Sequence, residues 1–328
     1  MTINMNFHLQ FPIPAFSEKL NYNQQSIFVG SCFSENIGEL MKRYKFNCII
    51  NPNGILYNPY SISKAINRYI ENKTLNDNDL FFSNEQWNSW EHHSCYSAND
   101  KAVCLKQIND SIQATHLYLK NTDWLFITWG SAFVYRNIET EKLVSNCHKV
   151  PQKRFEKQIL SAQEIVSDYQ LLLNKLKQLY PNLKIVFTVS PVRYVRDGVV
   201  ENNLSKAHLI SAVHKLINEF DYAYYFPAYE IVIDELRDYR FYKSDLVHPS
   251  EQAVEYVFEK LKNTLLDEQA IVTFEKIKEI IKAKEHLPFN KDSLEFKKFK
   301  QIFLEKCNQL SDQFPSIDLS NEVLYFKR

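Results

Sequence analysis

Residues 26–41 read SIFVGSCFSENIGELM, and this stretch decides the fold class. Residues 26–30 form a short apolar run that ends in glycine, which is typical of a buried strand. The apolar side chains that follow recur at helical spacing and fall on one face; they are Phe33, Ile37, Leu40, Met41 and Tyr44. A strand that leads directly into an amphipathic helix indicates a β-α-β unit, in which successive strands are parallel.

Four further runs are also short, bounded and rich in β-branched or aromatic residues; they are 46–50, 123–130, 184–189 and 222–226. Helical patterns separate them. One begins with a capping box of Ser161 and Glu164, and another follows Ser250, a good N-cap. This alternation predicts an α/β fold with right-handed crossovers and a parallel sheet that helices cover on both faces.

The remaining parts of the chain have less regular patterns. Between the second and third predicted strands, the spacing indicates helices near 62–71 and 105–120 around an irregular polar stretch. Beyond residue 265, two more helices are expected around a proline-containing break. Residues 275–306 hold nine Lys and six Asp or Glu, which is typical of a solvated helical face. We therefore expect an α/β domain over residues 1–265 and a helical extension over residues 266–328 that packs on it.

The composition is that of an ordinary globular protein without net charge, because 39 Lys and Arg balance 39 Asp and Glu. This balance argues against a nucleic-acid partner, since such proteins carry a clear basic excess. No apolar run reaches the roughly 18 residues of a membrane span, and the N-terminal segment lacks the basic and apolar regions of a signal peptide. Six cysteines without CxxC pairs indicate reduced thiols, so we expect a cytoplasmic protein that does not contact a membrane.

The turn Gly30-Ser31-Cys32, between the first strand and its helix, is the first candidate for chemistry. In an open parallel sheet, ligands bind beyond the carboxyl ends of the strands, which is where this turn lies. Unpaired N–H groups surround a thiol at a helix N-terminus, and we expect them to lower the pKa of Cys32. Ser31 or Cys32 is thus a candidate nucleophile; the alternative is an ordinary turn of small residues.

A second motif, SDLVHPS (244–250), places an aspartate three residues before a histidine and just ahead of a helix. The Asp245 carboxylate could accept the Nδ1 proton of His248, fix the tautomer and leave Nε2 free as a base. The alternative is a surface histidine beside an aspartate that caps the helix. Together with Cys32, the pair would supply the three parts of an activated nucleophile.

These motifs resemble those of a known family. An Asp-x-x-His-Pro-Ser sequence after a strand-end Gly-x-nucleophile is similar to the SGNH (GDSL-like) hydrolase superfamily, and GSCFS (30–34) resembles the signature of the GSCFA domain family. The similarity covers most of residues 20–265; the stretches that support it are SPVRYVRDG (190–198), NLSKAHL (203–209) and YFPAYEIVIDELRDYRFYKSDLVHPSEQAVEY (225–256). The resemblance implies a flavodoxin-like three-layer α/β/α fold with a five-stranded parallel sheet, and ester or acyl chemistry.

The resemblance also implies roles for the nucleophile and its base. The superfamily's Gly-Asp-Ser falls on Gly30-Ser31-Cys32, which makes Cys32 the nucleophile. A match shifted by one residue would select Ser31, but Gly30 would then no longer occupy the tight turn. Asp245 and His248 match the orienting carboxylate and the base.

The oxyanion donors match less completely. The oxyanion is expected to accept from the N–H groups of Cys32 and Gly54, and Gly54 matches the glycine whose N–H helps to stabilise the oxyanion. The superfamily's Gly-x-Asn falls on Gly130-Ser131-Ala132, where the asparagine is absent, and Ser131 or Asn53 could replace it. Loss of one donor would cost about 3 kcal/mol of transition-state stabilisation.

Other side chains have weaker signals. HHSC (92–95) contains metal-ligand types, but adjacent histidines diverge and no second pair stands at zinc spacing, so we expect no metal and no cofactor. His148 and Arg193 could hold an anionic or carbonyl group of a substrate, or make ordinary structural hydrogen bonds. Trp129 is expected to be a packed aromatic at a strand end, with a sugar-binding platform as the alternative.

The sequence thus supports three hypotheses. The first is an SGNH-like hydrolase that cleaves a carbohydrate-linked or small-molecule acyl ester through a covalent acyl-enzyme intermediate. The second is an acyltransferase that passes the acyl group to a sugar hydroxyl. The third is a non-catalytic binding domain that retains the fold, which the absent asparagine favours. Nothing in the sequence indicates the oligomeric state.

Overall fold

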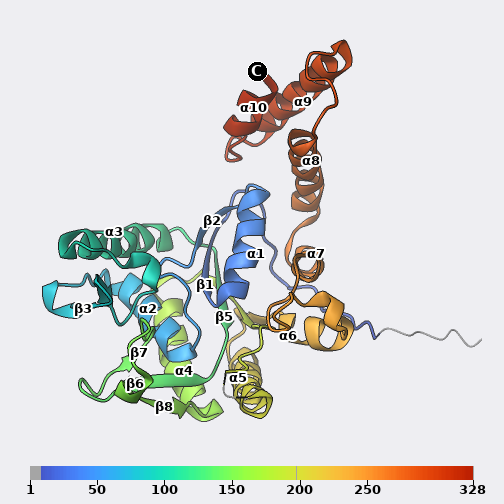
Figure 1. Ribbon diagram of the computed structural model, residues 1–328. Coiled ribbons are helices and arrows are strands. Elements are labelled where there is room, and N and C mark those ends of the chain that lie inside the picture. The colour runs from blue at the N-terminus through green and yellow to red at the C-terminus, as the bar shows by residue number, and fades with distance from the viewer. Residues whose placement is uncertain (1–8, 197, 328) are drawn as a thin grey trace, which may run out of the picture.

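The computed structural model describes residues 9–196 and 198–327, and its centre is a five-stranded sheet in the order β10-β9-β5-β1-β2 (Figure 1). Every neighbouring pair in this sheet is parallel. Its strands are β1 (Gln25–Gly30), β2 (Asn47–Ile50), β5 (Trp124–Trp129), β9 (Lys184–Val189) and β10 (Ala223–Tyr225). The predicted strands and the parallel α/β class are confirmed.

The order in which the chain visits the strands reverses beside β1. From β1 the chain moves outward to β2, then returns to the other side of β1 for β5 and continues to β9 and β10. Strands β1 and β5 are therefore neighbours, with Gly30 in register with Thr128. At such a reversal the connections after neighbouring strands diverge, which leaves a crevice at the carboxyl ends of those strands.

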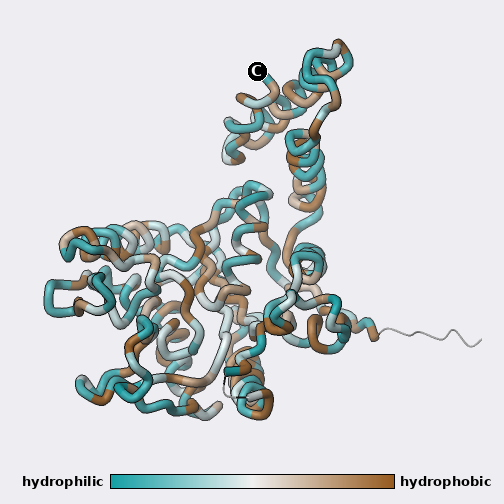
Figure 2. Tube along the Cα trace, in the orientation of Figure 1, coloured by the Kyte–Doolittle hydropathy of each residue, from teal (hydrophilic) through white to brown (hydrophobic). Residues whose placement is uncertain are grey.

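Helices cover both faces of the sheet. On one face lie α1 (Cys32–Arg43) and α7 (Glu251–Leu265); on the other lie α2 (Pro59–Glu71), α4 (Ala162–Leu179) and α5 (Val199–Glu219). Alternate residues of β1 serve the two faces, because Phe28 belongs to the core beneath α1 whereas Ile27 and Val29 belong to the core beneath α2. Figure 2 shows hydrophobic residues in the strands of this sheet and hydrophilic residues recurring along the outer helices.

Two insertions extend the three-layer core. The first lies between α2 and α3 (Lys101–Leu119) and contains η1 (Asp77–Asp79), the hairpin β3 (Leu80–Ser83) and β4 (Gln86–Ser89), and η2 (Ser94–Tyr96). The second follows β5 and is an antiparallel sheet of β6 (Phe133–Asn137), β7 (Leu143–Val144) and β8 (Phe155–Ile159), with η3 (Gln152–Arg154) before β8. The sequence pattern missed the β3–β4 hairpin because its strands have four residues each and β4, QWNS, lacks an apolar alternation.

The chain after β10 is helical. It forms α6 (Ala228–Glu230), η4 (Ile231–Glu235) and η5 (Tyr239–Phe241), and α7 follows. The two helices expected beyond residue 265 are α8 (Glu268–Glu285) and α9 (Leu294–Gln313), and α10 (Ser320–Lys327) is an additional one. In the part of the chain that the structure describes, no helix combines the length and the apolar character needed to cross a membrane.

The C-terminal helices contact the last turn of α1. The centre of the Phe274 ring in α8 lies 4.4 Å from the centre of the Tyr44 ring. Lys45 Nζ lies 2.7 Å from the Glu322 carboxylate of α10. One hydrophobic core continues from α1 and α7 into these helices. The predicted division at residue 265 stays a prediction, and its outer ends, residues 1–8 and 328, lie outside the described residues.

Candidate active site

The turn that follows β1 requires a glycine. Gly30 has φ +146°, and a Cβ on it would lie 2.2 Å from the Thr128 carbonyl oxygen of β5. The N–H of Ser31 donates to that same oxygen at 3.2 Å, so the turn is held against β5. Ser31 caps α1, and its Oγ accepts from the Phe33 N–H at 3.3 Å. This geometry places Ser31 and Cys32 at the carboxyl end of β1, beside the reversal of strand order.

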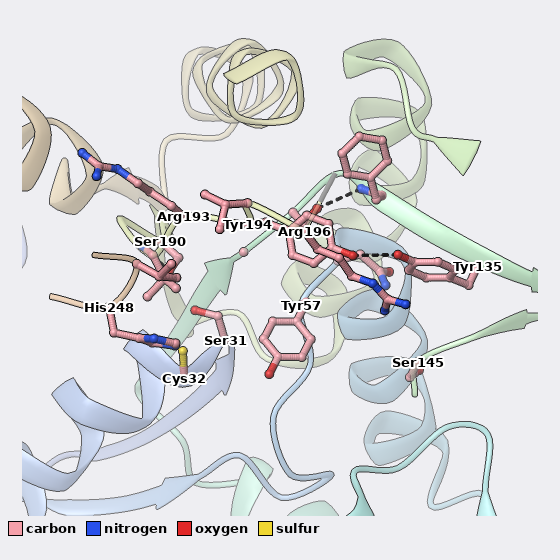
Figure 3. A pocket seen from close by; sticks show the side chains of 17 residues that line it. Ser31, Cys32, Tyr57, Tyr135, Ser145, Ser190, Arg193, Tyr194, Arg196 and His248 are labelled. Atoms are coloured by element: carbon pink, nitrogen blue, oxygen red, sulfur yellow. Dashed lines mark hydrogen bonds between the residues drawn. The ribbon is translucent and has the colours of Figure 1, made fainter. Parts of the chain in front are cut away.

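A cavity of about 430 Å³ lies above this turn. Residues after β1, β5 and β9 line its polar part; they are Ser31, Cys32, Gly130, Ser131 and Ser190, and His248 joins them from the loop before α7. Four aromatic residues, Tyr57, Phe133, Tyr135 and Tyr194, also line the cavity, together with three valines and two arginines. Figure 3 shows the three tyrosines. The candidate nucleophiles and the candidate base therefore face one cavity although they are more than 200 positions apart in the sequence.

The Asp245–His248 pair has the geometry that the sequence predicted. His248 Nδ1 lies 2.7 Å from Asp245 Oδ2, while the N–H groups of Val247 and His248 donate to Asp245 Oδ1 at 2.9 and 3.0 Å. These three hydrogen bonds hold the pKa of the Asp245 carboxyl well below its usual range, the His248 N–H making the largest contribution. An ionised carboxylate accepts the Nδ1 proton and leaves Nε2 without one.

Figure 3 shows the Cys32 sulfur directed at the His248 ring, and both side chains line the cavity. Burial raises the pKa of the Cys32 thiol, and the nearby Glu35 carboxylate raises it further. The N–H groups of Cys32 and Phe33 lower it, but by less than burial raises it. The N–H groups at the helix N-terminus thus lower the pKa of Cys32 as expected, but burial outweighs them, so the net pKa is raised and ionisation of Cys32 calls for a base.

Two of the predicted oxyanion donors lie elsewhere. The Gly54 N–H already donates to the Asn51 carbonyl at 2.7 Å, and Asn53 Nδ2 donates to the Glu91 carbonyl at 3.2 Å. Asn53 Oδ1 accepts from the Tyr69 hydroxyl, and neither Gly54 nor Asn53 lines the cavity. The structure thus contradicts the oxyanion role given to both, and they stabilise the loop after β2 instead.

Gly130 and Ser131 do line the cavity, but their backbone donors are in use. Both N–H groups donate to the Tyr57 carbonyl, at 2.8 and 2.9 Å. Ser131 Oγ accepts from the Phe133 N–H at 3.2 Å and lies 3.3 Å from Ser205 Oγ. These residues form the floor of the cavity, and their amides are not oxyanion donors.

Asn58 is a site residue that the sequence analysis missed. It caps α2, where its Oδ1 accepts from the Ser61 N–H at 2.8 Å, and it lines the cavity while only 4% exposed. Within the residues that the structure describes, the hydrogen bond to Oδ1 is the one found for this side chain. The Asn58-Pro59 dipeptide indicates a helix N-terminus, but nothing local shows that the residue lines a cavity.

The two predicted substrate-binding residues have structural partners. His148 is buried outside the cavity, with Nε2 2.8 Å from the Ser89 carbonyl and Nδ1 3.2 Å from Ser94 Oγ. Arg193 lines the cavity, yet it donates through Nη1 to the Leu246 carbonyl at 3.2 Å, and its guanidinium lies 4.2 Å from the centre of the Tyr242 ring. Arg193 therefore holds the loop that carries His248.

The other residues with weaker signals also lie in the protein interior or in local turns. His92 is buried with Nδ1 3.0 Å from Ser89 Oγ, and burial lowers its pKa to about 3. His93 Nδ1 accepts from the Cys95 N–H at 3.3 Å. Trp129 is fully buried and donates through Nε1 to the Tyr169 hydroxyl at 2.9 Å, so it is not a sugar-binding platform.

Three comparisons with known proteins complete the description. The chain has some similarity in structure to an acetyl xylan esterase from the rumen bacterium Butyrivibrio proteoclasticus (11% identity, TM-score 0.36, 76% of this chain and 64% of that one). It also resembles a carbohydrate esterase of family 3 from Talaromyces cellulolyticus (8% identity, TM-score 0.35, 77% of this chain and 98% of that one). A comparison with curated proteins found no match.

Family models match the sequence directly. The model of the GSCFA family matches residues 25–261, and the model described as GSCFA domain protein, C-terminal domain, matches residues 277–328. The first match begins with β1 and ends within α7, so it spans the sheet, the turn with Cys32 and the Asp245–His248 loop. Because it also covers well over half of the 328 residues, this chain belongs to the GSCFA family.

Proposed function

We propose that this protein is an SGNH-like hydrolase of acyl esters, with Cys32 as the nucleophile, His248 as the base and Asp245 as the residue that orients the base. One observation carries the proposal. A single cavity at the reversal of the sheet holds a cysteine at a helix N-terminus and a histidine whose Nδ1 lies 2.7 Å from a carboxylate. A nucleophile, a base and an orienting group in this order are the requirements of covalent acyl transfer.

The reaction would proceed in two steps. His248 Nε2 takes the thiol proton, and Cys32 Sγ attacks the carbonyl carbon, so that an S–C bond forms and the carbonyl oxygen becomes an oxyanion. Collapse of this intermediate breaks the bond to the alcohol oxygen, which leaves with the proton from His248. Water then attacks the thioester as His248 accepts its proton, the C–S bond breaks, and the proton returns to sulfur, which releases the acid.

Two donors could stabilise the oxyanion: the Cys32 N–H, which the sequence predicted, and Asn58, which it did not. The Cys32 N–H, at the first position of α1, donates to no other residue in the described part of the chain. Asn58 lines the same cavity, and the hydrogen bond from the Ser61 N–H to Oδ1 fixes its side-chain amide. A preorganised amide of this kind supplies the stabilisation that the absent Gly-x-Asn asparagine would give.

The cavity indicates the size and character of the substrate. A volume of about 430 Å³ suits a small ester, and the aromatic part beyond Cys32 offers flat apolar faces together with the Tyr135 and Tyr194 hydroxyls, which lie 2.8 Å apart. Sugar rings and small organic groups both combine apolar faces with hydroxyl contacts. We therefore propose a carbohydrate-linked or other small acyl ester as the substrate, without a nucleic-acid partner.

Hydrolysis of p-nitrophenyl acetate and butyrate tests this proposal. Cys32→Ala should abolish turnover and the acyl adduct that mass spectrometry would find on the peptide with residues 31–32, whereas Ser31→Ala should retain activity. Cys95→Ala, which removes an exposed cysteine outside the cavity, is the matched control. An inactive Ser31→Ala beside an active Cys32→Ala would make Ser31 the nucleophile. Wild-type turnover in both would rule out this site.

Acyltransfer is the second candidate, and it shares the thioester. Hydrolase and transferase differ only in whether water or a hydroxyl takes the acyl group from Cys32. Turnover in the presence of a sugar acceptor, with the products separated by mass spectrometry, distinguishes them. A protein that is folded, forms no adduct and yet binds sugar esters would instead be a binding domain.

A further inference from the structure

A buried lysine contacts the lining of the cavity that holds the candidate nucleophile. Lys206 of α5 is 2% exposed, and its Nζ donates to the carbonyl oxygens of Gly130 and Ser190, each at 2.6 Å. These two residues follow β5 and β9 and line the cavity with Cys32. Lys206 thus cross-links the strand ends that form the cavity floor.

Lys206 forms no ion pair with any Asp or Glu in residues 9–196 and 198–327. The ring of Tyr229 is centred 5.9 Å from its Nζ. Burial lowers the pKa of Lys206 to about 7, and the Cys32 thiolate is the charge that raises it. A buried ammonium without a counter-charge is unfavourable, so its charge depends on what faces it.

Lys262 shows the ordinary arrangement of a buried lysine in this chain. It is 7% exposed, and its Nζ lies 2.6 Å from Glu259 and 2.9 Å from Glu275. The two carboxylates raise its pKa. The difference between the two lysines is therefore the absence of a carboxylate paired with Lys206 in the described structure and the presence of a thiol.

Four titratable groups face Cys32 from different elements. Glu35 lies on the same helix, Tyr57 precedes α2, His248 precedes α7 and Lys206 belongs to α5. Glu35 disfavours a thiolate, whereas Lys206 favours it. His248 receives the thiol proton in the proposed reaction.

We propose that Lys206 is a positioning residue for Cys32. The buried ammonium of Lys206 is the counter-charge of the Cys32 thiolate. The inference deepens the proposed function and rests on it for the use of the thiolate. Two carbonyl oxygens hold the ammonium in place before the reaction, so it needs little reorganisation when charge develops on sulfur. NLSKAHL (203–209) contains this lysine, but its sequence shows no link to Cys32.

Alkylation of Cys32 by iodoacetamide, followed by mass spectrometry between pH 6 and 10, tests this role. Lys206→Met should raise the apparent pKa of Cys32 by about one unit or more, because it removes an opposite charge that interacts with the thiolate, and such a charge shifts a pKa by about one to three units. Alkylation at pH 7 should therefore slow about tenfold. Lys262→Met, the matched control, should leave the Cys32 profile unchanged. A folded Lys206→Met protein with the wild-type profile would overturn the proposal.

A second measurement does not depend on the folding of Lys206→Met. Electrostatic coupling is reciprocal, so removal of the thiol should lower the pKa of Lys206. Titration of ¹³Cε-labelled lysine by NMR in wild type and in Cys32→Ala measures this shift directly. An identical Lys206 titration in both proteins would refute the coupling. Neither measurement uses ester turnover, so coupling without turnover would leave this inference standing while the proposed function failed.

Discussion

Replacement of Asp245 by asparagine tests the orientation of His248. The asparagine Oδ1 can still accept from the backbone N–H groups of Val247 and His248, which now donate to Asp245 Oδ1. Its Nδ2, however, takes the place of the oxygen 2.7 Å from His248 Nδ1. Two donors cannot share a hydrogen bond, so His248 must keep its proton on Nε2, where it can no longer accept one from Cys32.

The exposure of the pair sets the expected magnitude. At a fully buried dyad the wrong tautomer lowers kcat by about 10⁴-fold. Here the side chains of His248 and Asp245 are 44% and 47% exposed. Water can therefore replace part of the carboxylate's interaction with the His248 ring. We expect Asp245→Asn to lower kcat about 100- to 1,000-fold with little change in KM.

The assay is steady-state hydrolysis of p-nitrophenyl acetate, together with ¹⁵N NMR of histidine, which reports the tautomer of His248. Asp238→Asn is the matched control, because Asp238 is exposed and accepts from the Arg240 N–H at 2.9 Å in a similar local turn. A kcat within about threefold of wild type in Asp245→Asn, or a tautomer that does not change, would refute the reasoning.

Two further predictions concern Asn58 and His92. Asn58→Asp keeps an N-cap for α2 but replaces the Nδ2 donor with an acceptor, so kcat should fall about 100-fold or more while the melting temperature stays near that of wild type; an unchanged kcat would exclude Asn58 as an oxyanion donor. Burial lowers the pKa of His92 to about 3, so between pH 6.5 and 3 the unfolded state binds the additional proton and the free energy of unfolding should fall by about 1.4 kcal/mol per pH unit. Urea unfolding at pH 4 to 7 should show a smaller slope in His92→Asn, and an equal slope would count against the burial argument.

The sequence could predict the sheet because parallel strands are buried on both faces and appear as short apolar runs. The segments SIFVG (26–30) and KIVFTV (184–189) show this, and both became strands of the central sheet. The same rule fails for β4, which belongs to the first insertion and whose sequence, QWNS, shows no apolar periodicity. Local pattern thus predicts the elements of the three-layer core better than those of its insertions.

The residues of the candidate site could likewise be predicted only in part. Cys32, Asp245 and His248 could be found because each lies in a short motif whose chemistry is local. Of the proposed oxyanion donors only the Cys32 N–H could be found from the sequence. Tertiary contacts decide which other N–H groups are in use, and the Tyr57 carbonyl, for example, accepts from those of Gly130 and Ser131. Asn58 and Lys206 likewise became site residues only through contacts across the fold.

The contacts at the two ends of α1 have an evolutionary consequence. The helix has 12 residues and is thus about 18 Å long, with Cys32 at its first position and the C-terminal helices against its last turn. Beside that last turn, Lys45 shares the buried Glu322 with Lys284, at 2.7 and 2.9 Å. A relative that loses this glutamate would leave two lysines facing each other, so substitutions at the three positions should be inherited together. Substitutions in the two segments that the family models match, residues 25–261 and 277–328, would then be coupled at the end of α1, the helix that begins with Cys32.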